Sequence, residues 1–134
     1  MTERILDHFG IAVPSLDEAI PIWTYLVGAP AIGRETVASQ AVEVVFIGSG
    51  AGRVELLAPT SPSSSVARFL EKRSSGIHHV CYRVPDLTAA LAEHKTQGFE
   101  LIDQEPRRGA HNHLIAFLHP RTANGVLVEL LQAG

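Results

Sequence analysis

The stretch Leu-Asp-His-Phe-Gly-Ile-Ala-Val-Pro-Ser-Leu, residues 6–16, returns 71 residues later as Ile-His-His-Val-Cys-Tyr-Arg-Val-Pro-Asp-Leu, residues 77–87. The repeat aligns His8 with His79. A repeated sequence usually marks a repeated structural unit, so we expect two similar halves in which these histidines occupy equivalent places.

A second repeat carries an acid. Val-Glu-Leu-Leu occurs at 54–57 and again at 128–131, which aligns Glu55 with Glu129. Two histidines and two glutamates, kept in the same order in both halves, predict that all four meet at one site on a pseudo-twofold axis.

The bulk properties favour one small globular domain, residues 1–134, of 14.4 kDa. The net charge of −3 and the absence of a Lys/Arg run argue against nucleic acid as a partner. No apolar stretch is long enough to span a membrane and no signal-peptide pattern opens the chain, so we expect a cytoplasmic protein with no membrane partner. Cys81 is the only cysteine, which excludes an intramolecular disulfide.

Periodicity and turn residues predict the same elements in each half. They are a strand at 5–13, a helix from Ser15 to Gly28, a hairpin of 42–47 with 54–57, a short helix at 66–72, a strand at 77–84, a helix from Asp86 to Gly98, and a hairpin of 114–118 with 126–131. An additional short strand is expected near Ala31–Glu35 or Glu100–Asp103.

Each half therefore reads as β-α-β-β or β-α-β-β-β, and the predicted fold class is α+β with two tandem modules. Module one covers about 5–60, a Pro/Ser-rich connector about 61–75, and module two about 76–132.

Strict alternation in the first strand places His8, Gly10 and Ala12 on one face and Asp7 with the bulky residues on the other. In the matching strand, His79 and Cys81 share a face, and alternation points His78 away from it. The small residues beside His8 leave space for a cavity. An acid between apolar strand residues is costly unless it is paired or binds a metal.

Imidazole and carboxylate ligands together suit Co, Ni, Mn, Zn or Fe, so the sequence predicts one divalent metal ion bound by His8, Glu55, His79 and Glu129. Four protein ligands leave one or two coordination positions open for a substrate.

These motifs resemble the vicinal oxygen chelate (glyoxalase/bleomycin resistance/dioxygenase) superfamily and, within it, the methylmalonyl-CoA epimerase family. The resemblance covers nearly all of 5–132 and implies two tandem βαβββ modules that form a cupped mixed sheet around a metal site. It rests on 6–13, on Val-Glu-Leu-Leu-Ala-Pro-Thr-Ser-Pro (54–62), on Gly-Ile-His-His-Val (76–80), on Ala-Phe-Leu-His-Pro (116–120) and on Gly-Val-Leu-Val-Glu-Leu (125–130).

The resemblance implies an isomerase that inverts C2 of a 2-methylmalonyl-CoA-like acyl thioester through a metal-stabilised enediolate. It gives Glu129 a second role as acid or base. Glu43 is the expected partner on the opposite face if Val45 pairs with Glu55 in the hairpin, whereas a slip of one residue places Val44 there. Family relatives also lead us to expect a homodimer.

Residues expected to contact the acyl-CoA are Arg83, Arg107, Arg108, His111 and His113. The family often has a Gly-Gly-basic stretch where this chain has His111-Asn112-His113, so this segment departs from the pattern.

The sequence is also compatible with other functions. The nearest alternative is a glyoxalase I-type lactoylglutathione lyase, which uses the same His-Glu-His-Glu set. A second alternative is a non-catalytic small-molecule-binding member of the superfamily, although four intact ligands argue against it. A third is an enzyme that acts on a different acyl thioester.

Overall fold

The computed structural model describes residues 4–133; residues 1–3 and 134, the ends of the predicted domain, lie outside the described part. Its elements, in chain order, are β1 (Ile5–Ala12), α1 (Leu16–Val27), β2 (Ala31–Val37), η1 (Ala38–Gln40), β3 (Val42–Ile47), β4 (Arg53–Pro59), α2 (Ser65–Arg73), β5 (Gly76–Arg83), α3 (Leu87–Thr96), β6 (Arg107–Arg108), η2 (Ala110–Asn112), β7 (Leu114–Leu118), η3 (Pro120–Thr122) and β8 (Val128–Gln132).

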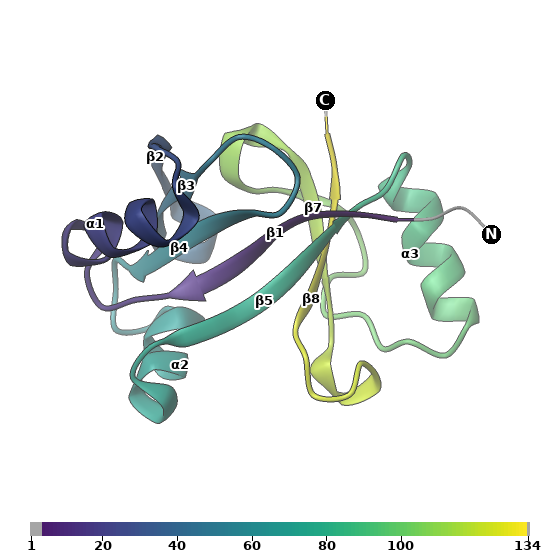
Figure 1. The fold of residues 1–134 in the computed structure, drawn as a ribbon. Coiled ribbons are helices and arrows are strands. Elements are labelled where there is room, and N and C mark those ends of the chain that lie inside the picture. Colours follow the sequence, from purple (N-terminus) through teal and green to yellow (C-terminus); the bar gives the residue numbers. More distant parts are fainter. Residues whose placement is uncertain (1–3, 134) are drawn as a thin grey trace.

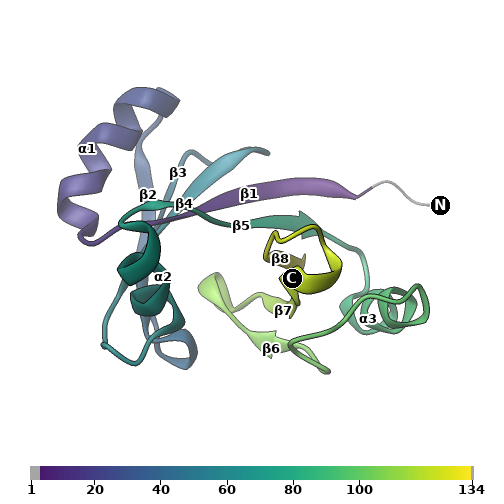
Figure 2. The same cartoon turned by 90° about the horizontal axis from the view of Figure 1, so that it is seen from below.

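All eight strands form one mixed sheet in the order β2-β3-β4-β1-β5-β8-β7-β6. β1 and β5 pair antiparallel at its centre, and each is flanked by a parallel partner from its own half, β4 beside β1 and β8 beside β5. The sheet curls around one side of this central pair (Figures 1 and 2). The predicted α+β fold with a cupped mixed sheet is confirmed.

Local sequence explains where the two longer helices begin. The side chain of Ser15 accepts a hydrogen bond from the Glu18 N–H, and that of Asp86 accepts one from the Ala89 N–H. Gly28 ends α1 in the left-handed conformation, as its position predicted.

The predicted short strand of the second half is displaced. Leu101 makes only an isolated bridge with Leu118, while the edge strand β6 is formed by Arg107–Arg108. In the first half the edge strand occurs where it was expected, at Ala31–Val37.

Two helices, α1 and α3, cover the outer faces of the two halves, whereas Val66 of α2 packs with Val44 and Leu57 on the inner side. α1 packs on β3 and β4, and α3 packs on β7 and β8. Outward-facing side chains such as Val45, Ile47 and Leu56 meet Leu16 and Ala19 of α1 in a buried cluster. Each half therefore buries its helix on the convex side, which leaves the concave side for the site.

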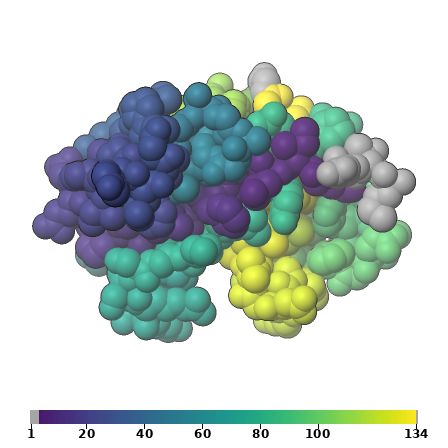
Figure 3. All heavy atoms as spheres, in the orientation of Figure 1, coloured from purple at the N-terminus to yellow at the C-terminus, as the bar shows by residue number. Residues whose placement is uncertain are grey.

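The centre of the convex face is not covered in the same way. Phe9 of β1 and Ile77 and Tyr82 of β5 are exposed, and Figure 3 shows the purple atoms of β1 at the surface. Thus only the end of the bulky face of the first strand, from Ile11 onward, packs under a helix. No helix in the described residues is long and apolar enough to cross a membrane.

Two irregularities interrupt the β1–β5 pairing beside the histidines. The register shifts between Leu6 and His8, and again between Gly10 and Ile11, where the partners jump from His79 to Ile77. Asp7 and His78 are the residues passed over. A bulge removes the simple two-residue alternation, so the predicted placement of Asp7 away from His8 is wrong: both side chains are buried and in contact.

Candidate metal centre

The four residues predicted from the repeats meet on the concave side, at the β1–β5 junction. His8 comes from β1 and Glu55 from the adjacent β4, while His79 comes from β5 and Glu129 from β8. All four are buried. One ligand atom from each lies within 4.8 Å of every other.

The distances among these atoms are nearly equal. The two Nε2 atoms of His8 and His79 are 3.2 Å apart. Glu129 Oε1 lies 3.2 Å from each Nε2, and Glu55 Oε1 lies 3.3 Å from each.

This arrangement fits a cation. Two ligand atoms that each lie about 2.1 Å from one ion are separated by about 3.0–3.4 Å at octahedral or tetrahedral angles. Glu129 Oε1 is also buried without any hydrogen bond from the described part of the chain. Buried carboxylate oxygens are costly without a partner, so these residues suit a divalent metal ion.

The electrostatics show how closely these groups interact. Burial alone would lower the pKa of His79, but the neighbouring carboxylates of Glu129 and Glu55 raise it to about 9. Burial alone would raise the pKa of Glu129, but the two imidazoles hold it well below its ordinary value. Both shifts reflect the attraction between the buried imidazoles and carboxylates, and a bound cation would take over the compensation of the carboxylate charge.

Asp7 orients the first histidine. His8 Nδ1–H donates to Asp7 Oδ2 at 2.7 Å, which directs Nε2 toward the cluster. Arg83 donates to Asp7 Oδ1 at 2.7 Å and Arg53 to Oδ2 at 3.1 Å. Although burial opposes it, these contacts hold the pKa of Asp7 well below its ordinary value.

His78 orients the second histidine, His79. The Nδ1 atoms of His78 and His79 are 2.9 Å apart, and in the tautomer that leaves His79 Nε2 free for a metal, His79 is the donor. Burial and the neighbouring His79 charge lower the pKa of His78 to about 4, which keeps it a neutral acceptor. Each ligand histidine is therefore oriented by the bulged residue that precedes it.

Gly10 makes room for His79. It pairs with His79 on one side and with Glu55 on the other. A methyl group at this position would overlap the His79 ring. The imidazole lies directly on the backbone of β1, which only glycine permits.

The hairpin register places Glu43 outside the cluster. Phe46, not Val45, pairs with Glu55, so Phe46 and Val44 face inward. Glu43 faces outward and accepts a hydrogen bond from Arg34 Nε at 2.6 Å. The predicted pairing of Val45 with Glu55, which would have turned Glu43 toward the metal site, is therefore wrong by one residue. Val44 faces the site instead.

Among the five residues expected to contact substrate, only His113 lines the cavity at the cluster. Arg83 is held by Asp7, Arg107 lies 3.2 Å from Asp103, and Arg108 donates to the Asn112 carbonyl. The His111 ring lies 5.0 Å from that of Phe46, centroid to centroid, and its backbone N–H donates to Glu35.

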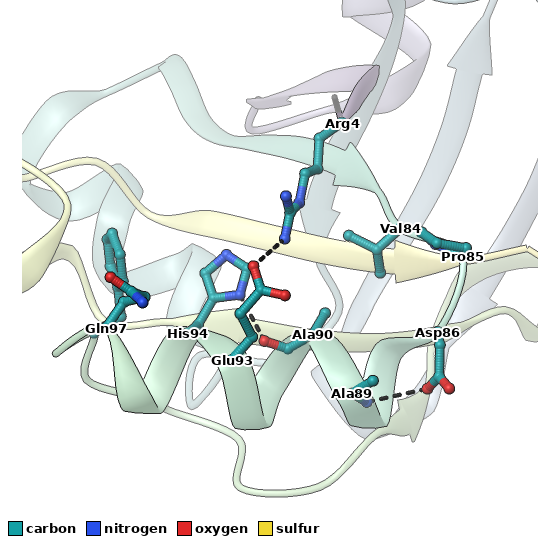
Figure 4. A pocket seen from close by; sticks show the side chains of 10 residues that line it. Arg4, Val84, Pro85, Asp86, Ala89, Ala90, Glu93, His94 and Gln97 are labelled. Carbon is teal, nitrogen blue, oxygen red and sulfur yellow. Dashed lines mark hydrogen bonds and ion pairs between the residues drawn. The ribbon is translucent and has the colours of Figure 1, made fainter. Parts of the chain in front are cut away.

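A larger hollow lies elsewhere, beside α3 (Figure 4). The Arg4–Glu93 ion pair, at 3.0 Å, crosses it, and Asp86 and His94 lie along it. It contains none of the four clustered residues. We therefore place the functional site at the small buried cavity, on its chemistry, and not at the larger hollow.

Comparisons with known proteins agree with this geometry. Residues 7–117 match the Glyoxalase/Bleomycin resistance protein/Dioxygenase superfamily. The chain is 40% identical over 129 residues to the ethylmalonyl-CoA/methylmalonyl-CoA epimerase of Cereibacter sphaeroides, covering 95% of this chain and 96% of that protein.

Solved structures show the same fold. The crystal structure of methylmalonyl-CoA epimerase from Mycobacterium tuberculosis superimposes with a TM-score of 0.92 at 37% identity, covering 97% of this chain and 88% of that one. A methylmalonyl-CoA epimerase in complex with methylmalonyl-CoA and NH4+ gives 0.93 at 31% identity, covering 99% and 96%.

Proposed function

The chain belongs to the Glyoxalase/Bleomycin resistance protein/Dioxygenase superfamily and is an isomerase of its methylmalonyl-CoA epimerase type, and from this premise we propose a metal-dependent inversion of C2 in a 2-methylmalonyl-CoA-like thioester. The observation that carries the proposal is the four-residue cluster, with ligand atoms 3.2–3.3 Å apart. A similar epimerase bound to methylmalonyl-CoA supports an acyl-CoA substrate.

The metal would be held by His8, Glu55, His79 and Glu129. When bound, a divalent cation supplies Lewis acidity toward substrate oxygens, which makes the neighbouring C–H more acidic. Asp7 and His78 fix the two imidazoles so that their Nε2 atoms point inward.

The surrounding residues exclude water and handle the proton. Val37, Val44, Phe46, Ile115 and Leu131 give the cavity an apolar lining, in which charges interact more strongly than in water. Glu129 presents a carboxylate oxygen without a hydrogen bond toward this space. In the proposal it exchanges a proton with C2 on one face of the substrate.

A cytoplasmic location and a homodimer stay predictions from the sequence.

The direct test compares two substrates on metal-loaded protein. Interconversion of the C2 epimers of methylmalonyl-CoA, with no conversion of a glutathione hemithioacetal, supports the epimerase. Conversion of the hemithioacetal alone would identify a glyoxalase I-type lyase. Binding of either compound without turnover would identify a non-catalytic member of the superfamily.

A further inference from the structure

An inversion at carbon needs proton transfer on two opposite faces of the reacting centre. Glu129 can serve one face, as proposed above. Glu43, which the sequence offered for the other, faces outward and binds Arg34. Val44 takes its place in the cavity and carries no proton. Because only the proposed function requires a proton carrier on the second face of C2, our inference about that carrier rests on the proposed function.

The lining of the cavity restricts the choice. Apart from the four clustered residues, most of the side chains that line it are apolar, and the two polar ones are Gln40 and His113. Of these two, only His113 can take up and release a proton near neutral pH. We propose that His113 is the second proton carrier of the epimerase.

The backbone around His113 holds it at the edge of the cavity. The His113 N–H donates to the Ala110 carbonyl at 3.2 Å, and the His113 carbonyl accepts from the Gly109 N–H at 2.9 Å. β7 begins at the next residue, Leu114. The preceding segment, η2, is tied to the other half of the sheet through the bond from His111 N–H to Glu35. His113 is thus fixed in place across the mouth of the cup.

The imidazole itself is free to act. Within residues 4–133, no hydrogen bond occupies either ring nitrogen of His113, and its nearest aromatic neighbour is His111, at 6.2 Å between ring centroids. Partial burial lowers the pKa of His113, as do the charges of His111, Arg53 and Arg83, whereas Asp7 acts in the opposite direction. These effects favour the neutral ring over the imidazolium, so a proton taken up by His113 is readily given away.

The proton balance closes with one shared proton. In one direction His113 starts with a proton taken from solvent. Ionised Glu129 removes the C2 proton, and the C–H electron pair moves into the thioester carbonyl to leave an enolate. Protonated His113 then delivers its proton to the opposite face, and the electron pair returns to form the new C2–H bond. The enzyme is left with a protonated Glu129 and a neutral His113, the state that converts the other epimer in the reverse sense.

The experiment treats the two epimers separately. Each purified C2 epimer of methylmalonyl-CoA is incubated in D2O with metal-loaded wild type, His113→Ala or His113→Gln. NMR follows loss of the C2 proton, and a stereospecific coupled assay follows interconversion. His94→Gln is the matched control, because His94 lies on α3 and bonds to the Ala90 carbonyl.

Removing a general acid or base costs about 10²–10⁴-fold in rate. We expect both His113 variants to lose at least about 10²-fold in interconversion and in exchange from the epimer whose C2 proton faces His113. Exchange from the other epimer, served by Glu129, should stay within about threefold of wild type. Added imidazole should restore interconversion in His113→Ala, and metal content should equal that of wild type.

Two results would overturn the assignment: interconversion at the wild-type rate in both variants, or equal loss of exchange from both epimers. If wild type itself neither exchanges nor interconverts either epimer, the proposed function fails as well. That outcome is distinguishable, because the assignment of His113 alone fails only when wild type is active.

Discussion

Replacing Gly10 by alanine tests the geometry of the metal centre without removing any ligand. A Cβ atom at Gly10 would overlap three atoms of the His79 ring, which lies directly on β1. His79 is buried, and its ring contacts those of His78 and Phe117, so it has little room to retreat. The added methyl group should displace His79 Nε2 from its place in the cluster.

The magnitude follows from two effects. Adding a methyl group to a packed interior costs about 1–3 kcal/mol of folding stability. Disturbing the orientation of a ligand lowers metal affinity about 10–100-fold, and displacing the ligand itself should cost at least as much. The stabilisation that a given metal concentration confers should therefore shrink by at least about 1.4–2.7 kcal/mol in Gly10→Ala.

The assay measures metal affinity by competition with a chromophoric chelator and thermal unfolding with and without metal. Gly50→Ala is the matched control, because a Cβ atom at Gly50 has nothing within 4 Å. The control should retain wild-type affinity. Wild-type metal affinity in Gly10→Ala would refute the placement of His79 against β1.

Two further substitutions test the residues around the cluster. Asp7→Asn should weaken metal binding about 10–100-fold, measured by chelator competition. It should also destabilise folding by about 1–3 kcal/mol in urea titrations, because Arg53 and Arg83 lose their carboxylate partner. The pKa of Asp7 is lowered in the folded protein, so its contribution is present above the ordinary pKa of an aspartate and disappears as the pH falls below it. Wild type and Asp7→Asn should consequently converge in stability in strong acid, and a constant difference would contradict this account. Glu43→Gln should leave the rate of C2 proton exchange unchanged, since Glu43 faces away from the cavity, whereas a loss of about 10²-fold would restore it as an acid or base.

The sequence predicted the main features of the site because a repeat constrains position strongly. Once His8 aligned with His79 and Glu55 with Glu129, an antiparallel junction of two similar halves was enough to bring them together. The caps at Ser15 and Asp86 were equally local in origin, since each depends on a side chain and a backbone N–H three residues apart.

Strand periodicity could not predict the residues that orient the two histidine ligands. Asp7 and His78 contact the ligands only because bulges in β1 and β5 break the alternation, and a single sequence gives no clear sign of a bulge. The signal that was present is their position: each directly precedes a ligand and can form a hydrogen bond.

The position of Glu43 depended on a strand register that the sequence left undecided by one residue. A one-residue slip moves every side chain of a strand to the other face, so Val44 and Glu43 exchange roles. The length of the β3–β4 turn sets this register, through the pairing of Phe46 with Glu55. His113 lies in an irregular segment, where neither helical nor strand periodicity applies.

The central claim is that the four clustered residues hold a metal and that Glu129 exchanges the C2 proton of the substrate. The most direct measurement combines metal analysis with NMR exchange of the C2 proton of methylmalonyl-CoA in D2O, on loaded, chelator-stripped and reloaded protein and on metal-loaded Glu129→Gln. We predict about one bound divalent ion per chain, loss of exchange on stripping, its return on reloading, and in Glu129→Gln no exchange from the epimer whose C2 proton faces Glu129. Undiminished exchange in the stripped protein, or from both epimers in metal-loaded Glu129→Gln, would contradict the claim.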